Sequence, residues 1–468
     1  MVEAAVRNTI VQTGGEVDKD LHQQILQGTR VWTSDGADLD VGLALAGGPH
    51  FSRLVCHAWD ESHGAGRLLA SAMKHDPEIE AVDRLLVTGK KPYSLAKFVS
   101  TSDVFRKKVG DAQAESGVSF VQHFGWAPQR FQSRARPLAR ESRRWHAIWS
   151  AVAAEADGNS QERKHLAMHL LASLGGQNST RLLLGGLLAD LSAEHYSWVA
   201  TGDLANPDAA PVMERRDSFY NRLDVLFLQG HIFKLPDTYT GVTLEFLKKT
   251  RFYHNGTNVT VFGIGELTDP ETRGRMRKAL QHVQGVVKNI KELFKVYRSE
   301  DSWLAMFTAF RLPSPPGCTE KLQRIIAEAK LQQPKALLEW QRLLPRAEAL
   351  QKAGCSTREA WGRASAEFPE FKAGRSLVEL FLVWKTSTGN VERRFRAYGE
   401  VMTPQRASLL DSTAETLMLA DQAPRSGQLR GTSQTATDTN GHKKKDYLAE
   451  LQFWHGELHP VTRERSQS

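Results

Sequence analysis

Residues 181–199 of this chain, RLLLGGLLADLSAEHYSWV, decide its fold. Leucine, alanine and glycine cover most faces of a helix drawn through them, and a helix that is apolar all round belongs in the interior of a large domain. Three polar residues, Asp190, Glu194 and His195, interrupt the apolar surface. The segment therefore predicts a helical domain with this helix at its centre.

The sequence on both sides of this segment is almost wholly helical in pattern. Between residues 62 and 371 apolar residues recur at helical spacing, and the breaks fall at prolines and glycines such as Pro77 and Pro236. Typical helix lengths predict roughly twelve to fifteen helices there. One short β segment is expected at residues 258–264, NVTVFGI, which has glycines close on either side.

Two further strands are predicted near the N-terminus. Residues 29–34 (TRVWTS) and 51–59 (FSRLVCHAW) have the composition of strands, and a helical pattern at 39–46 lies between them. This is a βαβ-like arrangement, whose crossover is right-handed if the two strands are parallel. The predicted fold class is therefore mainly α, with a partial α/β core near the N-terminus and a large all-helical region after it.

The composition is that of a folded protein with an excess of basic residues. The 468 residues are 41% hydrophobic, which suffices for sizeable cores, and the net charge of +8 favours polyanionic partners. Three cysteines without a CxxC pair argue against a disulfide framework or a zinc knuckle. No apolar run reaches the length of a membrane span, and the N-terminus lacks the apolar core of a signal peptide. We therefore expect a soluble intracellular protein without a membrane partner.

Basic residues are concentrated between residues 90 and 144. Twelve lysines and arginines stand there against four acidic residues, an excess equal to the net charge of the whole chain. Aromatic residues such as Phe124 and Trp126 lie among them, as on surfaces that follow a phosphate backbone. A solvated helical face is the alternative interpretation. On the first interpretation the residues expected to contact DNA are Lys107, Lys108, Arg130, Arg134, Arg136, Arg143 and Arg144.

Two acidic residues far apart in the sequence are candidates for a metal site. Asp35 follows the first predicted strand and precedes Gly36, where a short acid reaches into a cleft; an ordinary Asp-Gly turn is the alternative. Glu392 lies in residues 385–410, KTSTGNVERRFRAYGEVMTPQRASLL, whose apolar residues recur at helical spacing. There an acid is either a metal ligand or one half of a surface pair with Arg396, four residues further on.

These pieces resemble, in order along the chain, the hAT family of DNA transposases. TSTGNVERRF (386–395), preceded by FPEF (368–371) and followed by an arginine and a leucine pair, resembles the C-terminal dimerisation region of that family. TSDGADLD (33–40) resembles its strand-ending acid motif, and CHAWDESHGAGRLL (56–69) resembles its following strand. RFQS (130–133) resembles a short Arg-Trp motif of its helical insertion, with phenylalanine in the place of tryptophan.

The resemblance implies a ribonuclease H-like core in which three acids bind two divalent metal ions, with a long helical insertion between the second and third acid. Asp35 would be the second acid and Glu392 the third, both as ligands of Mg²⁺. Arg393 matches the family motif and joins the residues expected to contact DNA. Only 34 residues precede Asp35 and they are mostly helical in pattern, so we expect the first acid and the family's zinc finger to be missing.

The implied protein is an N-terminally truncated or domesticated hAT transposase that binds DNA and dimerises in the nucleus. Two acids leave a metal pair under-ligated, so enzymatic activity stays open. The alternative is a non-catalytic helical scaffold for protein interactions. The expected domains are a partial core at 1–75, the helical insertion at 76–370, C-terminal core and dimerisation helices at 371–422, and a disordered tail at 423–468.

Overall fold

The computed structural model describes residues 31–34, 55–90, 94–117, 124, 134–202, 208–256, 258–295 and 302–384. All of them belong to one compact unit, Gln23–Gly389, whereas the second unit, Met1–His22 with Asn390–Ser468, lies outside the described residues. The described part is mainly helical, as the sequence predicts.

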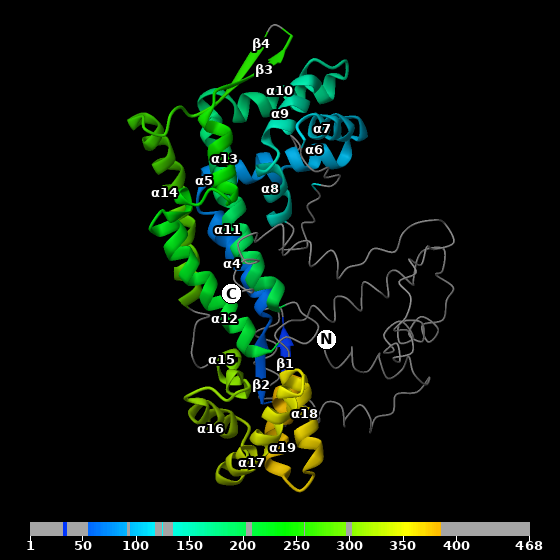
Figure 1. Ribbon diagram of the computed structural model, residues 1–468, viewed down its shortest axis with the longest axis vertical. Helices are drawn as coiled ribbons and strands as arrows, with labels where there is room; N and C mark the ends of the chain where they lie inside the picture. Colours follow the sequence, from blue (N-terminus) through cyan, green and yellow to red (C-terminus); the bar gives the residue numbers. More distant parts are fainter. Residues whose placement is uncertain are drawn as a thin grey trace, which may run out of the picture. The chain divides into compact units, whose positions relative to one another are not determined.

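Helix α11 (Thr180–Gly202) lies at the centre of the helical body (Figure 1). Every residue of this helix from Leu182 to His195 is buried, which confirms the central helix predicted from the sequence. The helices packed against it are α4 (Glu61–Met73), α8 (Ala135–Ser142), α12 (Ala209–Leu223), α13 (Tyr239–Lys248) and α14 (Pro270–Lys295).

Asp190 in the middle of α11 caps a neighbouring helix. Its carboxylate accepts hydrogen bonds from the backbone N–H groups of Tyr239 and Thr240 at 3.1 and 2.8 Å, and from the Thr240 hydroxyl at 2.6 Å. The first N–H groups of a helix have no acceptor inside that helix. The buried acid therefore serves the first turn of α13, and the polar interruption of α11 has a structural role.

The other two polar residues of α11 also bind neighbouring helices. Glu194 accepts two hydrogen bonds from the guanidinium of Arg222 in α12, both at 2.6 Å. His195 Nε2 lies 2.7 Å from the carbonyl oxygen of Ala65 in α4. Each polar group has a partner in a different helix, so together they fix the neighbours around α11.

The remaining elements of this body are shorter. They are α5 (Pro77–Asp83), η2 (Arg84–Thr88), α6 (Leu95–Thr101), α7 (Asp103–Glu115), α9 (Trp145–Ala156), α10 (Gln161–Leu174), η4 (Gly176–Ser179), η5 (Asp224–Leu228) and η6 (His231–Lys234). Three of them begin at capping residues that the sequence supplies: the side chains of Asp76, Ser94 and Ser102 accept hydrogen bonds from the first N–H groups of α5, α6 and α7.

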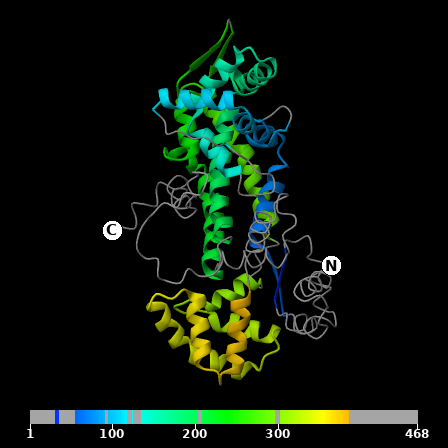
Figure 2. The same ribbon diagram turned by 90° about the vertical axis from the view of Figure 1, so that its right-hand side faces the viewer.

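A second group of helices follows α14 in the chain and has its own aromatic core. The group consists of α15 (Trp303–Phe307), η7 (Thr308–Phe310), α16 (Cys318–Glu328), α17 (Gln333–Lys352), α18 (Thr357–Glu367) and α19 (Lys372–Val383). Figure 2 shows α16–α19 together, in yellow to orange. The ring of Phe310 stacks on that of Phe381 at 4.6 Å, and its carbonyl oxygen accepts a hydrogen bond from Trp361 Nε1 at 2.7 Å. These contacts join η7, α18 and α19 into one core.

The two strands near the N-terminus form a parallel pair. β1 (Val31–Ser34) pairs with β2 (Cys56–Trp59), and the register sets Ser34 opposite Trp59. Both strands fall inside the predicted segments, and Cys56 is buried against the core of the second helix group. The helix predicted at residues 39–46 lies outside the described residues. A two-stranded pair does not by itself establish a ribonuclease H-like core.

The expectation that the insertion is all-helical is wrong at one place. β3 (Arg251–Asn255) and β4 (Asn258–Phe262) form an antiparallel hairpin, and β4 coincides with the short β segment expected from the sequence. Tyr253 and Phe262 are buried on one face of the hairpin, where the Phe262 ring stacks on Trp149 of α9 at 4.8 Å. β3 was not predicted from the sequence because its residues, RFYHN, do not alternate between apolar and polar types. Only the packing of β3 on α9 shows which of its faces is buried.

Among the described residues, no helix is both long enough and apolar enough to cross a membrane.

Candidate nucleic-acid interface

The acids predicted to bind metal lie outside the described residues. Asp35 comes directly after Ser34, the last residue of β1, and Glu392 comes after α19. Arg130 and Arg393, predicted to contact DNA, also lie outside them. Among the described residues no group of three or more His, Cys, Asp and Glu side chains is placed to hold a metal ion. The Mg²⁺ site stays a prediction from the resemblance.

The two lysines of the predicted DNA-binding set differ in their surroundings. Lys107 on α7 is exposed. Lys108, the next residue, has its ammonium 2.5 Å from the Glu155 carboxylate and donates a hydrogen bond to the carbonyl oxygen of Ala154 at 3.2 Å. Lys108 therefore ties α7 to α9 through an acid that also pairs with Arg163 at 2.6 Å.

The four described arginines of the predicted DNA-binding set are used mainly inside the fold. The Arg144 side chain is 4% exposed and donates to the Arg140 carbonyl. Arg143 lies with its guanidinium 5.1 Å from the centre of the Tyr239 ring. Arg134 lies 3.6 Å from the carboxylate of Asp83, and Arg136 is half-buried.

As a result the stretch does not present its charge as one surface. Counting charges along the sequence cannot tell a cation that faces solvent from one that a distant acid or ring holds in the interior. Of the six described residues in the predicted DNA-binding set, Lys107 alone belongs to the exposed class.

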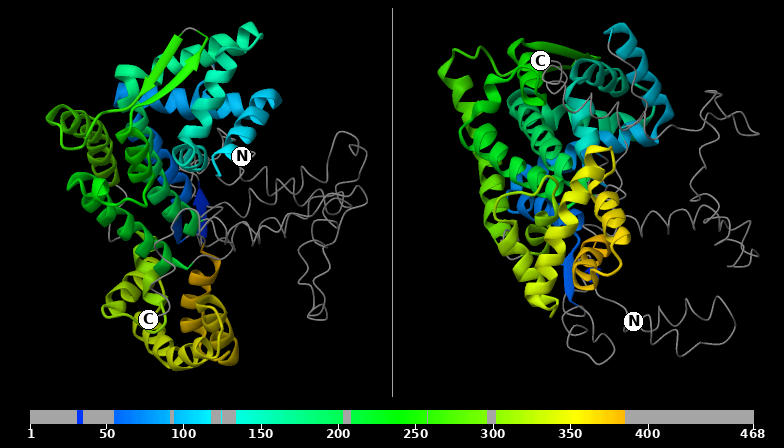
Figure 3. Two further views of the ribbon diagram at one scale, coloured as in Figure 1. Left: turned by 45° about the horizontal axis from the view of Figure 1, so that its top comes forward. Right: turned by 60° about the horizontal axis from the view of Figure 1, so that its bottom comes forward.

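Helix α14, on the outside of the helical body in Figures 1 and 3, carries a basic face toward solvent. The helix contains seven lysines and arginines and two glutamates. Its apolar side is buried at helical spacing by residues that include Val283, Val287, Ile290 and Phe294. The basic residues consequently gather on the opposite, solvent-facing side.

Polar contacts on the flanks of this helix fix its rotation. Lys291 reaches both carboxylate oxygens of Asp224 in η5, at 2.5 and 2.7 Å. On the other flank His282 Nδ1 lies 2.8 Å from the carboxylate of Asp76 at the start of α5. A carboxylate only accepts, so the imidazole donates through Nδ1. The outward direction of the exposed basic residues is therefore set by contacts on both sides.

Two arginines and one lysine form what we call the α14 stripe: Arg273, Arg277 and Lys288. All three are exposed, and none has a hydrogen-bond or ion-pair partner among the described residues. At 100° per residue they fall within about 60° of one another around the helix, and Arg273 and Lys288 are separated by about 22 Å along its axis. This is a linear array of unpaired cations, the arrangement that a phosphate backbone requires.

A cavity of about 360 Å³ adjoins the stripe on the flank of α14 that faces α5 and the first turn of α11. Four basic side chains line it, Arg181, Arg275, Lys278 and His282, against one acid, Glu78. Lys278 is exposed and has no partner among the described residues. The cavity is therefore a basic recess beside the stripe, contributed by three helices.

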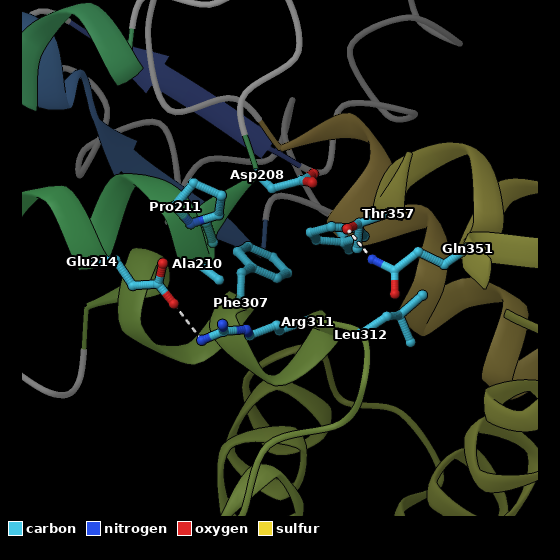
Figure 4. A pocket seen from close by; sticks show the side chains of 11 residues that line it. Asp208, Ala210, Pro211, Glu214, Phe307, Arg311, Leu312, Gln351 and Thr357 are labelled. Carbon is cyan, nitrogen blue, oxygen red and sulfur yellow. Dashed lines mark hydrogen bonds and ion pairs between the residues drawn. The ribbon is translucent and has the colours of Figure 1, made fainter. Parts of the chain in front are cut away.

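A second cavity, of about 170 Å³, lies between the start of α12 and the second helix group (Figure 4). Its polar side chains are directed at one another: Glu214 pairs with Arg311, and Gln351 donates to the Thr357 hydroxyl at 3.4 Å. Asp208, also in its wall, has its pKa raised by burial. Because the Arg311 cation is paired with Glu214 and the other charged group is the acid Asp208, this cavity offers less to a phosphate than the basic recess does.

The α14 residues were missed at the sequence level although the signal was present. Residues 270–295 hold seven basic residues on an amphipathic pattern, whereas residues 90–144 hold twelve, so the number of basic residues alone favours the stretch at 90–144. Exposure and missing partners, which separate the two clusters, depend on the tertiary structure.

Comparison of the chain with protein-family models, with curated proteins and with solved structures finds no match.

Proposed function

We propose that the protein binds DNA through its sugar-phosphate backbone, with the α14 stripe as the main contact surface. The observation that carries the proposal is the array of three exposed cations, Arg273, Arg277 and Lys288, without partners among the described residues. A cation already paired with an acid gains little from a phosphate, whereas an unpaired one releases a condensed counterion from the DNA when it binds.

The resemblance to hAT transposases supplies the biological context of the proposal. The motif order along the chain and a parallel strand pair directly ahead of Asp35 are in keeping with such a descent. On this proposal the protein is a transposase-derived nuclear DNA-binding protein that dimerises through its C-terminal helices, with Asp35 and Glu392 as Mg²⁺ ligands. Isothermal titration with Mg²⁺ tests the metal part: Glu392→Gln should weaken binding, and an unchanged affinity would remove that residue from the site.

The salt dependence of duplex binding tests the proposal. Replacing the stripe by Arg273→Gln, Arg277→Gln and Lys288→Gln removes up to three phosphate contacts. Each lost contact reduces the slope of log K against log salt by about 0.9 and weakens binding about eightfold at 0.1 M salt. We therefore expect the triple variant to lose about 2.7 from the slope and about 500-fold in affinity.

The matched control removes the same charge elsewhere. Arg215→Gln, Lys352→Gln and Lys372→Gln replace exposed basic residues of α12, α17 and α19 that also have no side-chain partner among the described residues. This control should keep at least two thirds of the wild-type slope. Equal losses in the two triple variants would mean that only net charge matters. A large loss from Lys107→Gln alone would return the interface to the stretch at residues 90–144.

A protein-interaction scaffold is the second candidate, and one observation favours it. On the face of the β3–β4 hairpin that points away from α9, Phe252 is 60% exposed and Val259 is 48% exposed. Exposed apolar side chains that lie together on one face often mark a contact with another protein. A slope of log K against log salt near zero in the duplex-binding assay would mean that no phosphate contacts form, and it would favour the scaffold over binding to the DNA backbone.

A further inference from the structure

The basic recess between α5, the start of α11 and α14 has a shape and charge distinct from those of the α14 stripe. The stripe is a line of cations on a convex helix face, whereas the recess is a half-open hollow of about 360 Å³. We propose that it binds a phosphate monoester, either on a free nucleotide or at the 5′ end of a DNA strand. The DNA-end form rests on the proposed function, and the nucleotide form stands without it.

An ion pair and a histidine–carboxylate hydrogen bond build the walls of the recess. Arg181 donates through Nε and Nη2 to Glu78 at 2.7 and 3.3 Å, and through Nη1 to the carbonyl oxygen of Ser173 at 3.1 Å. The hydrogen bond from Arg181 is the main reason why the pKa of Glu78 is lowered, so Glu78 stays ionised and balances Arg181. The pair of His282 with Asp76 closes the opposite side. These side chains set the shape of the recess, and the charges of Arg181 and Glu78 offset each other.

The net positive charge of the recess comes from α14. Lys278 has no partner among the described residues. Arg275 pairs through Nη2 with Glu271, which is 72% exposed and one turn away on the same helix, a pair of little strength in water. The ammonium of Lys278 and the free edge of the Arg275 guanidinium are therefore available to a dianion, and phosphate oxygens are the acceptors that such donors favour.

The start of α11 contributes further donors. Thr180, the first residue of the helix, lies in the wall together with the side-chain amide of Gln177 on η4, whereas the neighbouring Asn178 amide already donates to the Ala172 carbonyl oxygen at 3.0 Å. The N-terminus of a 23-residue helix carries partial positive charge on its first N–H groups. Thr180 and Lys278 line the same recess, so the positive potential of the helix N-terminus adds to the positive charge of the lysine.

The size of the recess selects the kind of phosphate. At about 360 Å³ it is larger than a phosphate group needs and stands at the lower end of small-molecule sites. Leu184 and Ala279 supply apolar wall for an attached nucleoside. A backbone phosphodiester carries a nucleoside on both sides and has one negative charge, whereas a monoester enters with three oxygens free and carries up to two. The geometry therefore fits a mononucleotide or a terminal 5′-phosphate.

Phosphorus NMR on the full chain tests the site, with adenosine 5′-monophosphate and inorganic phosphate as probes. We expect line broadening that titrates to saturation with wild type, and at least a tenfold weaker affinity for Lys278→Gln. Lys352→Gln is the matched control, because it removes one charge from an exposed lysine of α17 outside both the recess and the α14 stripe, and it should change the affinity less than twofold. Equal losses in both variants, or no saturable binding by wild type, would overturn the proposal unless the next arm detects the terminal phosphate.

A second arm separates the two sources of the phosphate. Duplexes with and without a 5′-phosphate are compared for binding to wild type and to Lys278→Gln. Tighter binding of the phosphorylated duplex that Lys278→Gln abolishes assigns the site to a DNA end, and equal binding of both duplexes alongside saturable nucleotide binding assigns it to a free nucleotide. If the stripe variants leave DNA binding intact while Lys278→Gln abolishes nucleotide binding, the proposed function fails and the phosphate site stands.

Discussion

Replacing Asp190 by asparagine should make the stability of this protein respond differently to pH. The Asp190 carboxylate is buried in α11, and that burial is the largest cause that raises its pKa from 3.8 to about 6. Hydrogen bonds from Thr240 and Tyr239 favour the ionised form and oppose the rise, and the nearby charge of Glu194 adds to it. Burial prevails over three donated hydrogen bonds, and this balance is what the experiment tests.

The sign follows from the direction of the shift. Because the folded protein binds the proton more tightly than the unfolded chain, Asp190 stabilises the fold most below pH 3.8, and this stabilisation is lost as the pH rises through 6. A pKa that is about 2 higher in the folded protein than in the unfolded chain corresponds to about 3 kcal/mol in the free energy of unfolding. Between pH 4 and 7.5 the free energy of unfolding of wild type should therefore fall by most of that amount relative to Asp190→Asn.

Urea unfolding of both proteins at several pH values, followed by circular dichroism, measures the difference. Asp237→Asn, an exposed aspartate just before α13, is the matched control and should follow wild type at every pH. A difference between wild type and Asp190→Asn that does not change with pH would refute the reasoning. A difference that grows in favour of wild type as the pH rises would mean that the hydrogen bonds, and not burial, set the pKa.

Two further predictions concern packing around α11 and α8. Gly186→Ala would place a methyl group 2.7 Å from the Thr243 hydroxyl and 3.1 Å from the Tyr239 carbonyl oxygen, so we expect about 1–3 kcal/mol of destabilisation by overpacking at the α11–α13 crossing. Gly285→Ala on α14, where nothing lies within 4 Å of the added carbon, should stabilise by about 0.5–1 kcal/mol, and equal melting temperatures of the two variants would contradict this. Glu141 is fully buried and neither carboxylate oxygen has a hydrogen-bond partner among the described residues, so Glu141→Met should raise the urea midpoint by an amount equivalent to about 1–3 kcal/mol, whereas Glu141→Gln, which keeps the polar atoms, should leave it nearly unchanged at pH 4. Burial raises the pKa of Glu141, so the advantage of the methionine variant should grow with pH, and a lower midpoint for Glu141→Met would show that the acid has a partner.

The central helix illustrates what local sequence predicts well. The apolar run at residues 181–199 has no face suited to water, and that property alone predicts burial on all sides. The structure confirms it in α11, together with the helical character of the surrounding chain and the existence of β1, β2 and β4. These features depend on interactions between residues near one another in sequence or on composition, and both can be read from the sequence.

The polar residues of α11 illustrate what local sequence leaves open. Asp190, Glu194 and His195 are visible in the sequence as interruptions, but their partners lie in α13, α12 and α4. No spacing rule connects an acid in one helix with the start of another some fifty residues away. Their roles as caps and ties between helices therefore depend on the packing.

The sequence by itself determined a mainly helical chain, its central helix, the early strand pair and an excess of positive charge, because periodicity and composition are local properties. Tertiary structure alone decided where that charge is available. It holds Arg144 in the interior and pairs Lys108 with Glu155, whereas Arg277 and Lys278 face solvent on a helix fixed by contacts on both flanks. The physical reason is that a cation binds a phosphate only if no acid or ring of the protein already holds it, and such partners come from distant parts of the chain.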